Sequence, residues 1–278
     1  MTTTVLLGAI APHSDLAIAE ACSPETRDVT PQTQRAMDGF GRRVAAVRPD
    51  AVVVATPHNV HVTGHMAVLT SAAVSGALED TAQPLPLSAA VDRDLALAVL
   101  GEMRRSGIPT VGVSFGGNVP AESSSPLDWG THVPLWHVFR HAEPLPVVVV
   151  IPARDLDAKA HVCAGAAVVR AAAATGRTIA FVASADQGHG HSADGPYGFA
   201  PESAAFDAKI QDIVARGALN ELLDVTEDEA HAALVDSWWQ MLMLHGALEE
   251  DGARFGSRLL AYEVAVYCGV LTALFERL

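Results

Sequence analysis

Two histidines stand in the same local context, each directly after an apolar run and a proline. His13 follows Pro12 and the run Val5–Ala11, and His58 follows Pro57 and the run Ala51–Ala55. Such runs are typical of buried strands, and open α/β sheets bind ligands just outside the carboxyl ends of their strands. A proline stiffens the turn that aims each ring. We therefore expect the two imidazoles to converge on one point, although either alone could be an ordinary loop residue.

A metal with open coordination positions needs a third ligand. Two histidines and one carboxylate form the facial arrangement that holds Fe(II) in non-haem oxygenases. The candidate carboxylate is Glu263, an acid within an otherwise apolar strand pattern at Leu259–Val266. A buried carboxylate is costly unless it is paired or bound to a metal. The alternative is an edge strand on which Glu263 faces solvent.

A further pair of histidines lies in the segment Ser184-Ala-Asp-Gln-Gly-His189-Gly-His191, directly after the apolar run Thr178–Ala183. This places another imidazole at a strand end, so we expect His189 to face the same cleft as His13 and His58. An unperturbed histidine titrates near neutrality and can take and return a proton during turnover. The His-Gly-His pattern is equally consistent with a metal-binding tract or a flexible loop.

The elements that must position these residues alternate along the chain. We predict strands at Val5–Ala11, Ala51–Ala55, Met66–Thr70, Thr110–Ser114, Val147–Ile151, Thr178–Ala183 and Arg258–Val266. Helices are predicted at Pro31–Arg48, Ser88–Ser106, Leu156–Thr175, Glu202–Ala215, Leu219–Leu223 and Glu227–Leu248, the last with room for a break. This alternation predicts an α/β fold: one domain over residues 1–278, with a central, mostly parallel or mixed sheet flanked by helices.

Composition excludes several classes of function. The chain carries 18 Lys and Arg against 32 Asp and Glu, a net charge of −14, and has no basic run. We therefore expect neither a nucleic-acid nor a membrane partner. The three cysteines are scattered and the N-terminus lacks a basic leader, which indicates a cytoplasmic protein. The apolar segment Val264–Phe275 is a candidate interface for a homo-oligomer, most simply a dimer.

Several short motifs resemble, in this order, those of the class III (LigB-type) extradiol ring-cleavage dioxygenases. They are Pro12-His13, Pro57-His58-Asn59, the Ser-Ala-Asp-Gln-Gly-His stretch ending at His189, Pro196-Tyr-Gly-Phe and Ala261-Tyr-Glu263. The segment Pro126-Leu-Asp-Trp-Gly-Thr-His132-Val-Pro-Leu is similar to the family's Asp-His-Gly…Val-Pro-Leu element. The resemblance runs from residue 5 to about residue 265.

The resemblance implies a LigB-like fold and a mononuclear Fe(II) held by His13, His58 and Glu263. It also implies that His189 is the acid/base residue and that the substrates are O2 and a small aromatic molecule, such as a catechol, a 2-aminophenol or a dihydroxypyridine. Trp129 stands where many members have a histidine. His132, three residues later, is then the candidate for that histidine's role of hydrogen-bonding substrate or oxygen, and Trp129 is expected to reshape the pocket.

Two other classes of function remain open at this point. Imidazole and carboxylate ligands also suit Zn(II), so the same His/His/Glu set could serve a metal-dependent hydrolase. A Memo-like binding protein would keep the pocket without the activity. The presence of all four residues, His13, His58, His189 and Glu263, favours the enzyme over the binding protein.

Overall fold

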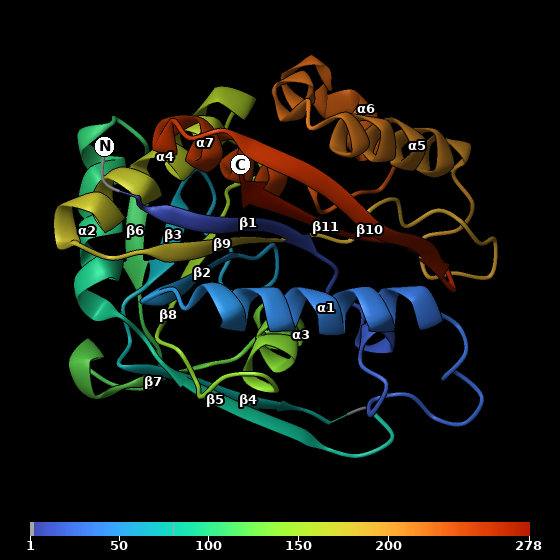
Figure 1. The fold of residues 1–278 in the computed structure, drawn as a ribbon, viewed down its shortest axis with the longest axis horizontal. Helices are drawn as coiled ribbons and strands as arrows, with labels where there is room; N and C mark the ends of the chain where they lie inside the picture. Colours follow the sequence, from blue (N-terminus) through green and yellow to red (C-terminus); the bar gives the residue numbers. More distant parts are fainter. Residues whose placement is uncertain (1–2, 80) are drawn as a thin grey trace.

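The computed structural model describes residues 3–79 and 81–278 and shows an eight-stranded mixed sheet between helices (Figure 1). In spatial order its strands are β10 (Phe255–Ala265), β11 (Cys268–Arg277), β1 (Val5–Ala11), β9 (Ile179–Ser184), β2 (Ala51–Ala55), β8 (Val147–Ile151), β3 (Met66–Leu69) and β6 (Thr110–Val113). The four central strands β1, β9, β2 and β8 are parallel to one another, whereas β11 and β3 join them antiparallel. The predicted fold class is confirmed.

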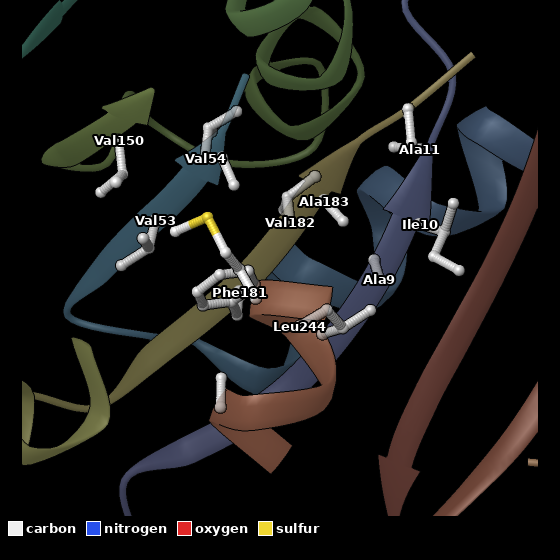
Figure 2. Packing of buried hydrophobic residues seen from close by; sticks show 14 of the residues in the cluster. Ala9, Ile10, Ala11, Val53, Val54, Val150, Phe181, Val182, Ala183 and Leu244 are labelled. Atoms are coloured by element: carbon white, nitrogen blue, oxygen red, sulfur yellow. The ribbon is translucent and has the colours of Figure 1, made fainter. Parts of the chain in front are cut away.

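The central strands are apolar along their whole length because both faces of the sheet are covered. Every residue of β2, β8 and β9 is buried. Figure 2 shows Val53, Phe181 and their neighbours with Leu244 of a covering helix beside them. Each such fully buried aliphatic or aromatic side chain contributes about 1.5–3 kcal/mol to folding. Unbroken apolar runs are therefore the sequence signature of these strands.

Two groups of helices cover the sheet. Helices α1 (Pro31–Val47) and α3 (Trp129–Phe139) pack together on one face (Figure 1). Helices α2 (Arg93–Arg105), α4 (Ala158–Thr175) and α7 (Trp238–Asp251) form the layer on the other. Helices α4 and α7 touch backbone to backbone, since a Cβ at Gly165 would lie 1.8 Å from the Met243 carbonyl oxygen. Trp238 and Trp239 of α7 belong to this core.

The remaining helices and strands lie outside the eight-stranded sheet. Helices α5 (Pro201–Arg216) and α6 (Glu227–Ala232) precede α7, and a three-stranded sheet consists of β5 (Leu85–Ala90), β4 (Ala73–Leu78) and β7 (Ser124–Pro126). Short 3-10 helices are η1 (Asp15–Ala17), η2 (Pro120–Glu122) and η3 (Leu219–Asp224). No helix in the described ranges is both long and apolar enough to cross a bilayer.

One predicted helix and the predicted character of one apolar segment differ from the structure. The helix expected over Ser88–Ser106 begins only at Arg93, because Asp92 caps it by accepting a hydrogen bond from the Leu95 amide at 3.1 Å. The residues before it form strand β5. At the C-terminus, the segment Val264–Phe275 is largely strand β11, which is buried between β10 and β1. The apolar side chains of β11 from Cys268 to Phe275 are core residues and not a free interface, whereas Val264 and Val266 before this strand are exposed.

Candidate metal centre and its cavity

The predicted convergence of the histidines is confirmed by the structure. Strands β1, β9 and β2 are adjacent and parallel, so the residues that follow them meet at one edge of the sheet. His13 and His58 come together with their Nε2 atoms 3.0 Å apart. His189, from the loop after β9, lies beside them. This edge is where ligands bind in open α/β sheets.

The carboxylate that joins this pair is Asp236, which sequence reasoning missed. Its Oδ2 atom lies 3.2 Å from His13 Nε2 and 3.1 Å from His58 Nε2. The three side chains form a group of donor atoms suited to a metal ion. The available signal was a lone acid two residues before the mostly apolar segment Trp238–Leu248.

Asp236 reaches the site because the predicted long helix breaks in front of it. Helix α6 ends at Ala232, and Leu234 turns the chain with a φ of 55°. The start of α7 is then tied to the loop after β9: Ser237 Oγ donates to Gln187 Oε1 at 3.0 Å, and Gln240 Nε2 donates to the Ser184 carbonyl at 3.1 Å. These two bonds fix the carboxylate over the histidine pair.

The ring of His13 is held in a defined orientation. Its backbone N–H donates to Asp186 Oδ1 at 3.0 Å, and its Nδ1 lies 3.0 Å from Ser184 Oγ. Since the Ser184 hydroxyl donates its proton to the Gly130 carbonyl, it accepts from Nδ1–H of His13. This bond leaves Nε2 as the atom that faces Asp236 and His58. Such a partner on the far ring nitrogen is typical of metal-binding histidines.

The loop that carries His58 is anchored by Asp128, the N-cap residue of α3. Its carboxylate accepts hydrogen bonds from Thr56 Oγ1 at 2.7 Å and from Asn59 Nδ2 at 2.8 Å, on either side of His58. It also accepts from the Thr131 amide at 2.9 Å. Trp129, next to it, packs on the His58 ring with centroids 4.3 Å apart.

The charges at the centre are strongly coupled. Burial by itself lowers the pKa of His13, but the carboxylates of Asp186 and Asp236 outweigh burial and raise it to about 9. For Asp236, burial opposes ionisation, yet the neighbouring imidazoles hold its pKa well below the usual range. Burial raises the pKa of Asp186 against the opposing pull of His13. The two carboxylates therefore favour a positive charge at His13, as a proton or as a metal ion in its place.

The residues fit a metal ion. The three donor atoms are 3.0–3.2 Å from one another. Neighbouring ligand atoms around an octahedral ion, with bonds of about 2.1 Å, lie about 3.0 Å apart. The Oδ1 atom of Asp236 is buried without a hydrogen-bond partner in the described part of the chain. A facial set of two imidazoles and one carboxylate leaves further positions open for substrate.

Glu263 does not join this group, which corrects the predicted third ligand. It lies on β10, beyond β11, and its carboxylate accepts hydrogen bonds from the Thr33 amide at 2.7 Å and the Gln32 amide at 3.3 Å. These amides belong to the first turn of α1, whose N-cap residue Thr30 provides no side-chain cap. Glu263 therefore caps a helix, where a negative charge is favoured by the helix dipole.

His132 is also absent from the described cavity wall, so its predicted contact with substrate or oxygen is corrected. It lies on the buried side of α3 with 1% of its surface exposed. Neither ring nitrogen has a hydrogen-bond partner within the described residues, and burial lowers its pKa to about 4. Trp129, one turn earlier, is the residue of this segment that faces the cavity.

His189 lies at the centre with a ring that is still accessible. Its Nε2 is 4.0 Å from Asp236 Oδ2, and Tyr197 contacts its ring edge-on at 5.7 Å between centroids. The loop is held by Asp207 of α5, which accepts hydrogen bonds from the Gly188 amide, from His191 Nε2 and from the Tyr262 hydroxyl at 2.8, 2.8 and 2.6 Å. His191 is thereby a structural partner of Asp207.

A second group of donor atoms adjoins the first. Asp186, His189 and Cys268 have donor atoms within 4.8 Å of one another. Asp186 Oδ2 is also 3.6 Å from His13 Nε2, so the two groups share one end of the same cavity. Burial raises the pKa of the Cys268 thiol.

The cavity has a volume of about 700 Å³, and His13 and His58 of the candidate metal centre lie in its wall. His13, Asp186 and Cys268 lie at its buried end. Trp129, Tyr197 and Tyr267 supply aromatic walls. A cavity of this size, mostly apolar with a few convergent polar groups, is typical of a small-molecule site.

Comparison with known proteins agrees with this architecture. The family model for the catalytic LigB subunit of aromatic ring-opening dioxygenase matches residues 7–271. The chain belongs to the LigB family. The resemblance drawn from the motifs is thereby confirmed.

One curated relative and one solved structure are similar over most of this LigB-family chain. The chain is 22% identical over 253 residues to Protein CA_C1420 of Clostridium acetobutylicum, covering 91% of this chain and 53% of that protein. It thus spans about half the length of that relative. The crystal structure of uncharacterized protein JW3007 from Escherichia coli K12 matches with a TM-score of 0.63 at 16% identity, covering 97% of this chain and 99% of that one. The second likeness bears on the fold alone.

Proposed function

We propose that this chain is a non-haem Fe(II)-dependent extradiol dioxygenase that opens the ring of a catechol-like, 2-aminophenol-like or dihydroxypyridine-like aromatic with O2. The observation that carries the proposal is the convergence of His13, His58 and Asp236 at the carboxyl edge of the sheet in a LigB-family chain. The ligand set is the one expected of such enzymes, with Asp236 in place of the predicted Glu263.

The three ligands and the cavity walls have distinct tasks in this proposal. His13, His58 and Asp236 would hold the ion, and a facial set of this kind leaves positions open for substrate. When bound there, the iron supplies the redox chemistry and a common template for the two substrate oxygens and dioxygen. Trp129 and Tyr197 contact the flat faces and edges of an aromatic ring in the cavity.

His189 is the acid/base group in this proposal. Its ring lines the cavity beside the candidate ligands, and its Nδ1 is buried without a hydrogen-bond partner among the described residues. It takes a proton from a substrate hydroxyl and returns it when the ring opens. Its Nε2 atom lies 4.0 Å from Asp236 Oδ2, so the ring is within reach of a substrate held at the candidate ligands.

The test is metal content and oxygen uptake of anaerobically purified protein with a panel of catechols, 2-aminophenols and dihydroxypyridines. Iron near one per chain, oxygen consumption and a yellow ring-opened product are expected. His189→Gln should retain iron and lose about 10²- to 10⁴-fold in turnover, whereas the exposed-site control His65→Gln should behave as the parent protein. Iron-loaded protein that consumes no oxygen with any of these compounds would refute the proposal.

A second candidate is a zinc-dependent hydrolase at the same site. The specific observation in its favour is Cys268, whose thiol lies near His189 and Asp186, because thiolate ligands suit zinc. The same purification separates the two functions: zinc bound in preference to iron, with hydrolysis of an ester or amide and no oxygen uptake, would establish the hydrolase.

A further inference from the structure

Apart from the histidines and the proposed metal ion at the inner end, the charged residues that line the cavity are all acidic. Its titratable wall residues besides histidine, tyrosine and cysteine are Asp15, Glu79 and Asp186, and no lysine or arginine is among the described lining residues. Asp15 and Glu79 are exposed, and neither has an ion pair with a basic residue in the described part of the chain. A ligand that enters this cavity therefore meets unneutralised carboxylates at its mouth.

Arginines are placed elsewhere in this molecule. A groove between α1 and β10 is lined by four of them, Arg35, Arg42, Arg43 and Arg258. Arg43 and Arg258 pair there with Glu276. Since a carboxylate-bearing aromatic is normally recognised by arginine or lysine in its pocket, the cavity lacks the groups that such a substrate needs.

The mouth also carries exposed aromatic rings. Trp129 is 51% exposed and Tyr197 is 62% exposed, although both line the cavity. Tyr197 and Tyr267 lie with ring centroids 6.1 Å apart. An organic cation at this mouth is attracted by the charge of the carboxylates and also by the quadrupole of the aromatic rings.

The candidate metal ligands lie at the inner end of the cavity, and the exposed acidic and aromatic residues lie at its mouth. The candidate metal ligand His13 is 3% exposed at the inner end, whereas Asp15, Glu79, Trp129 and Tyr197 are exposed. A ring whose two adjacent oxygens point inward to the metal centre therefore directs a substituent on its far side toward the mouth. The charge of that substituent then determines whether the carboxylates at the mouth attract or repel the substrate.

We propose that the substrate is an aromatic diol whose side chain ends in an ammonium group, held by Asp15 and Glu79 and by the rings of Trp129 and Tyr197. This inference rests on the proposed dioxygenase function for the orientation of the ring. Catechols with a carboxylate on the same side chain are disfavoured, and uncharged ones are intermediate. Each exposed carboxylate contributes a factor of about two to five in affinity for the cation, and a ring contributes a similar factor.

The experiment compares three catechols that differ only at the end of a two-carbon side chain. They are 4-(2-aminoethyl)catechol, 3-(3,4-dihydroxyphenyl)propanoate and 4-ethylcatechol. Dissociation constants are measured by calorimetry on anaerobic, metal-loaded protein at low ionic strength, and kcat/KM is measured by oxygen uptake. The ammonium compound should be preferred over the carboxylate compound by about tenfold or more, and the preference should shrink with added salt. Equal affinities, or tighter binding of the carboxylate compound, would overturn the inference.

Charge-neutral variants locate the effect. Asp15→Asn and Glu79→Gln should each reduce the ammonium-to-carboxylate ratio about threefold, and the double variant about tenfold. Glu122→Gln, an exposed acid outside the cavity, is the matched control and should leave the ratio unchanged. A ratio that survives the double variant would contradict the assigned role of these carboxylates.

Failure of the dioxygenase proposal can be told apart from failure of this one. 2-Phenylethylammonium and 3-phenylpropanoate lack the diol, and their binding to metal-free protein requires neither iron nor turnover. A preference for the ammonium probe in protein that consumes no oxygen would support the charge inference and reject the reaction. Oxygen consumption without a charge preference would support the reaction and reject the charge inference.

Discussion

The sharpest prediction from the structure is that metal binding depends on Asp236 and does not depend on Glu263. Asp236 faces the two imidazoles, whereas Glu263, the acid that the family motif suggested, caps α1. Asp236→Asn and Glu263→Gln are isosteric changes that each remove one negative charge. We expect the first to abolish tight metal binding and the second to leave it intact.

The size of the first effect follows from His13. Its pKa of about 9, against the ordinary 6.5, means that the surrounding carboxylates stabilise one positive charge by at least about 3 kcal/mol. Asp186 and Asp236 share this effect, and a divalent ion gains about twice as much from each as a proton does. Removal of the Asp236 charge should therefore weaken metal binding by about 3 kcal/mol, or two to three orders of magnitude.

Chelator competition on anaerobically loaded protein measures this difference directly. Circular dichroism and urea unfolding of both variants check that the fold is intact. Glu263→Gln should cost at most about 1 kcal/mol of stability through its helix cap. Metal affinity at the parent level in Asp236→Asn, or its loss in folded Glu263→Gln, would refute the assigned ligand set.

Three further predictions concern the loop, the pH dependence and the packing. Asp207→Asn should retain metal but lower kcat about tenfold, because the loop that carries the proposed base His189 loses its anchor. The pH profile of kcat should also shift in this variant. An unchanged pH profile would count against the positioning role of Asp207. Burial lowers the pKa of His137 and His161 to about 4, so the unfolded chain takes up their protons first, and stability present above pH 6.5 is lost as the pH falls toward 4. Urea unfolding at pH 5 should show a loss of about 2 kcal/mol per histidine relative to pH 7.5; a flat profile would contradict this. Gly165→Ala should destabilise by about 1–3 kcal/mol because its Cβ would collide with a backbone carbonyl of α7, while Gly39→Ala, which meets nothing within 4 Å, should be neutral or stabilising by thermal unfolding.

Much of the sheet was predictable because burial on both faces leaves a simple signature. The runs Val5–Ala11, Ala51–Ala55 and Val147–Ile151 coincide with β1, β2 and β8. The order of the strands in the sheet cannot be predicted from the apolar runs. The convergence of His13 and His58 could still be predicted, because parallel strands have their carboxyl ends at the same edge of a sheet.

The errors arose where a local pattern competes with long-range structure. Leu85–Ala90 contains alanines and a serine that suit a helix, yet it pairs with β4, and Asp92 was the cap that could have marked the true start. Strand β11 and the interface expected from its apolar residues were confused because a buried strand and an exposed apolar patch have the same composition. The pairing of β11 with β10 on one side and β1 on the other distinguishes them.

The missed ligand shows why a motif cannot replace the geometry of a site. Glu263 and Asp236 are each a single acid beside apolar residues, and from sequence both satisfy the argument that a buried carboxylate needs a partner. The structure gives them different partners: amide groups of a helix terminus for Glu263, and two imidazoles for Asp236. Each arrangement satisfies one negative charge with local positive potential. Only the second converges with other donor atoms at the edge of the sheet where a substrate can enter, so the chemistry of this chain is expected there.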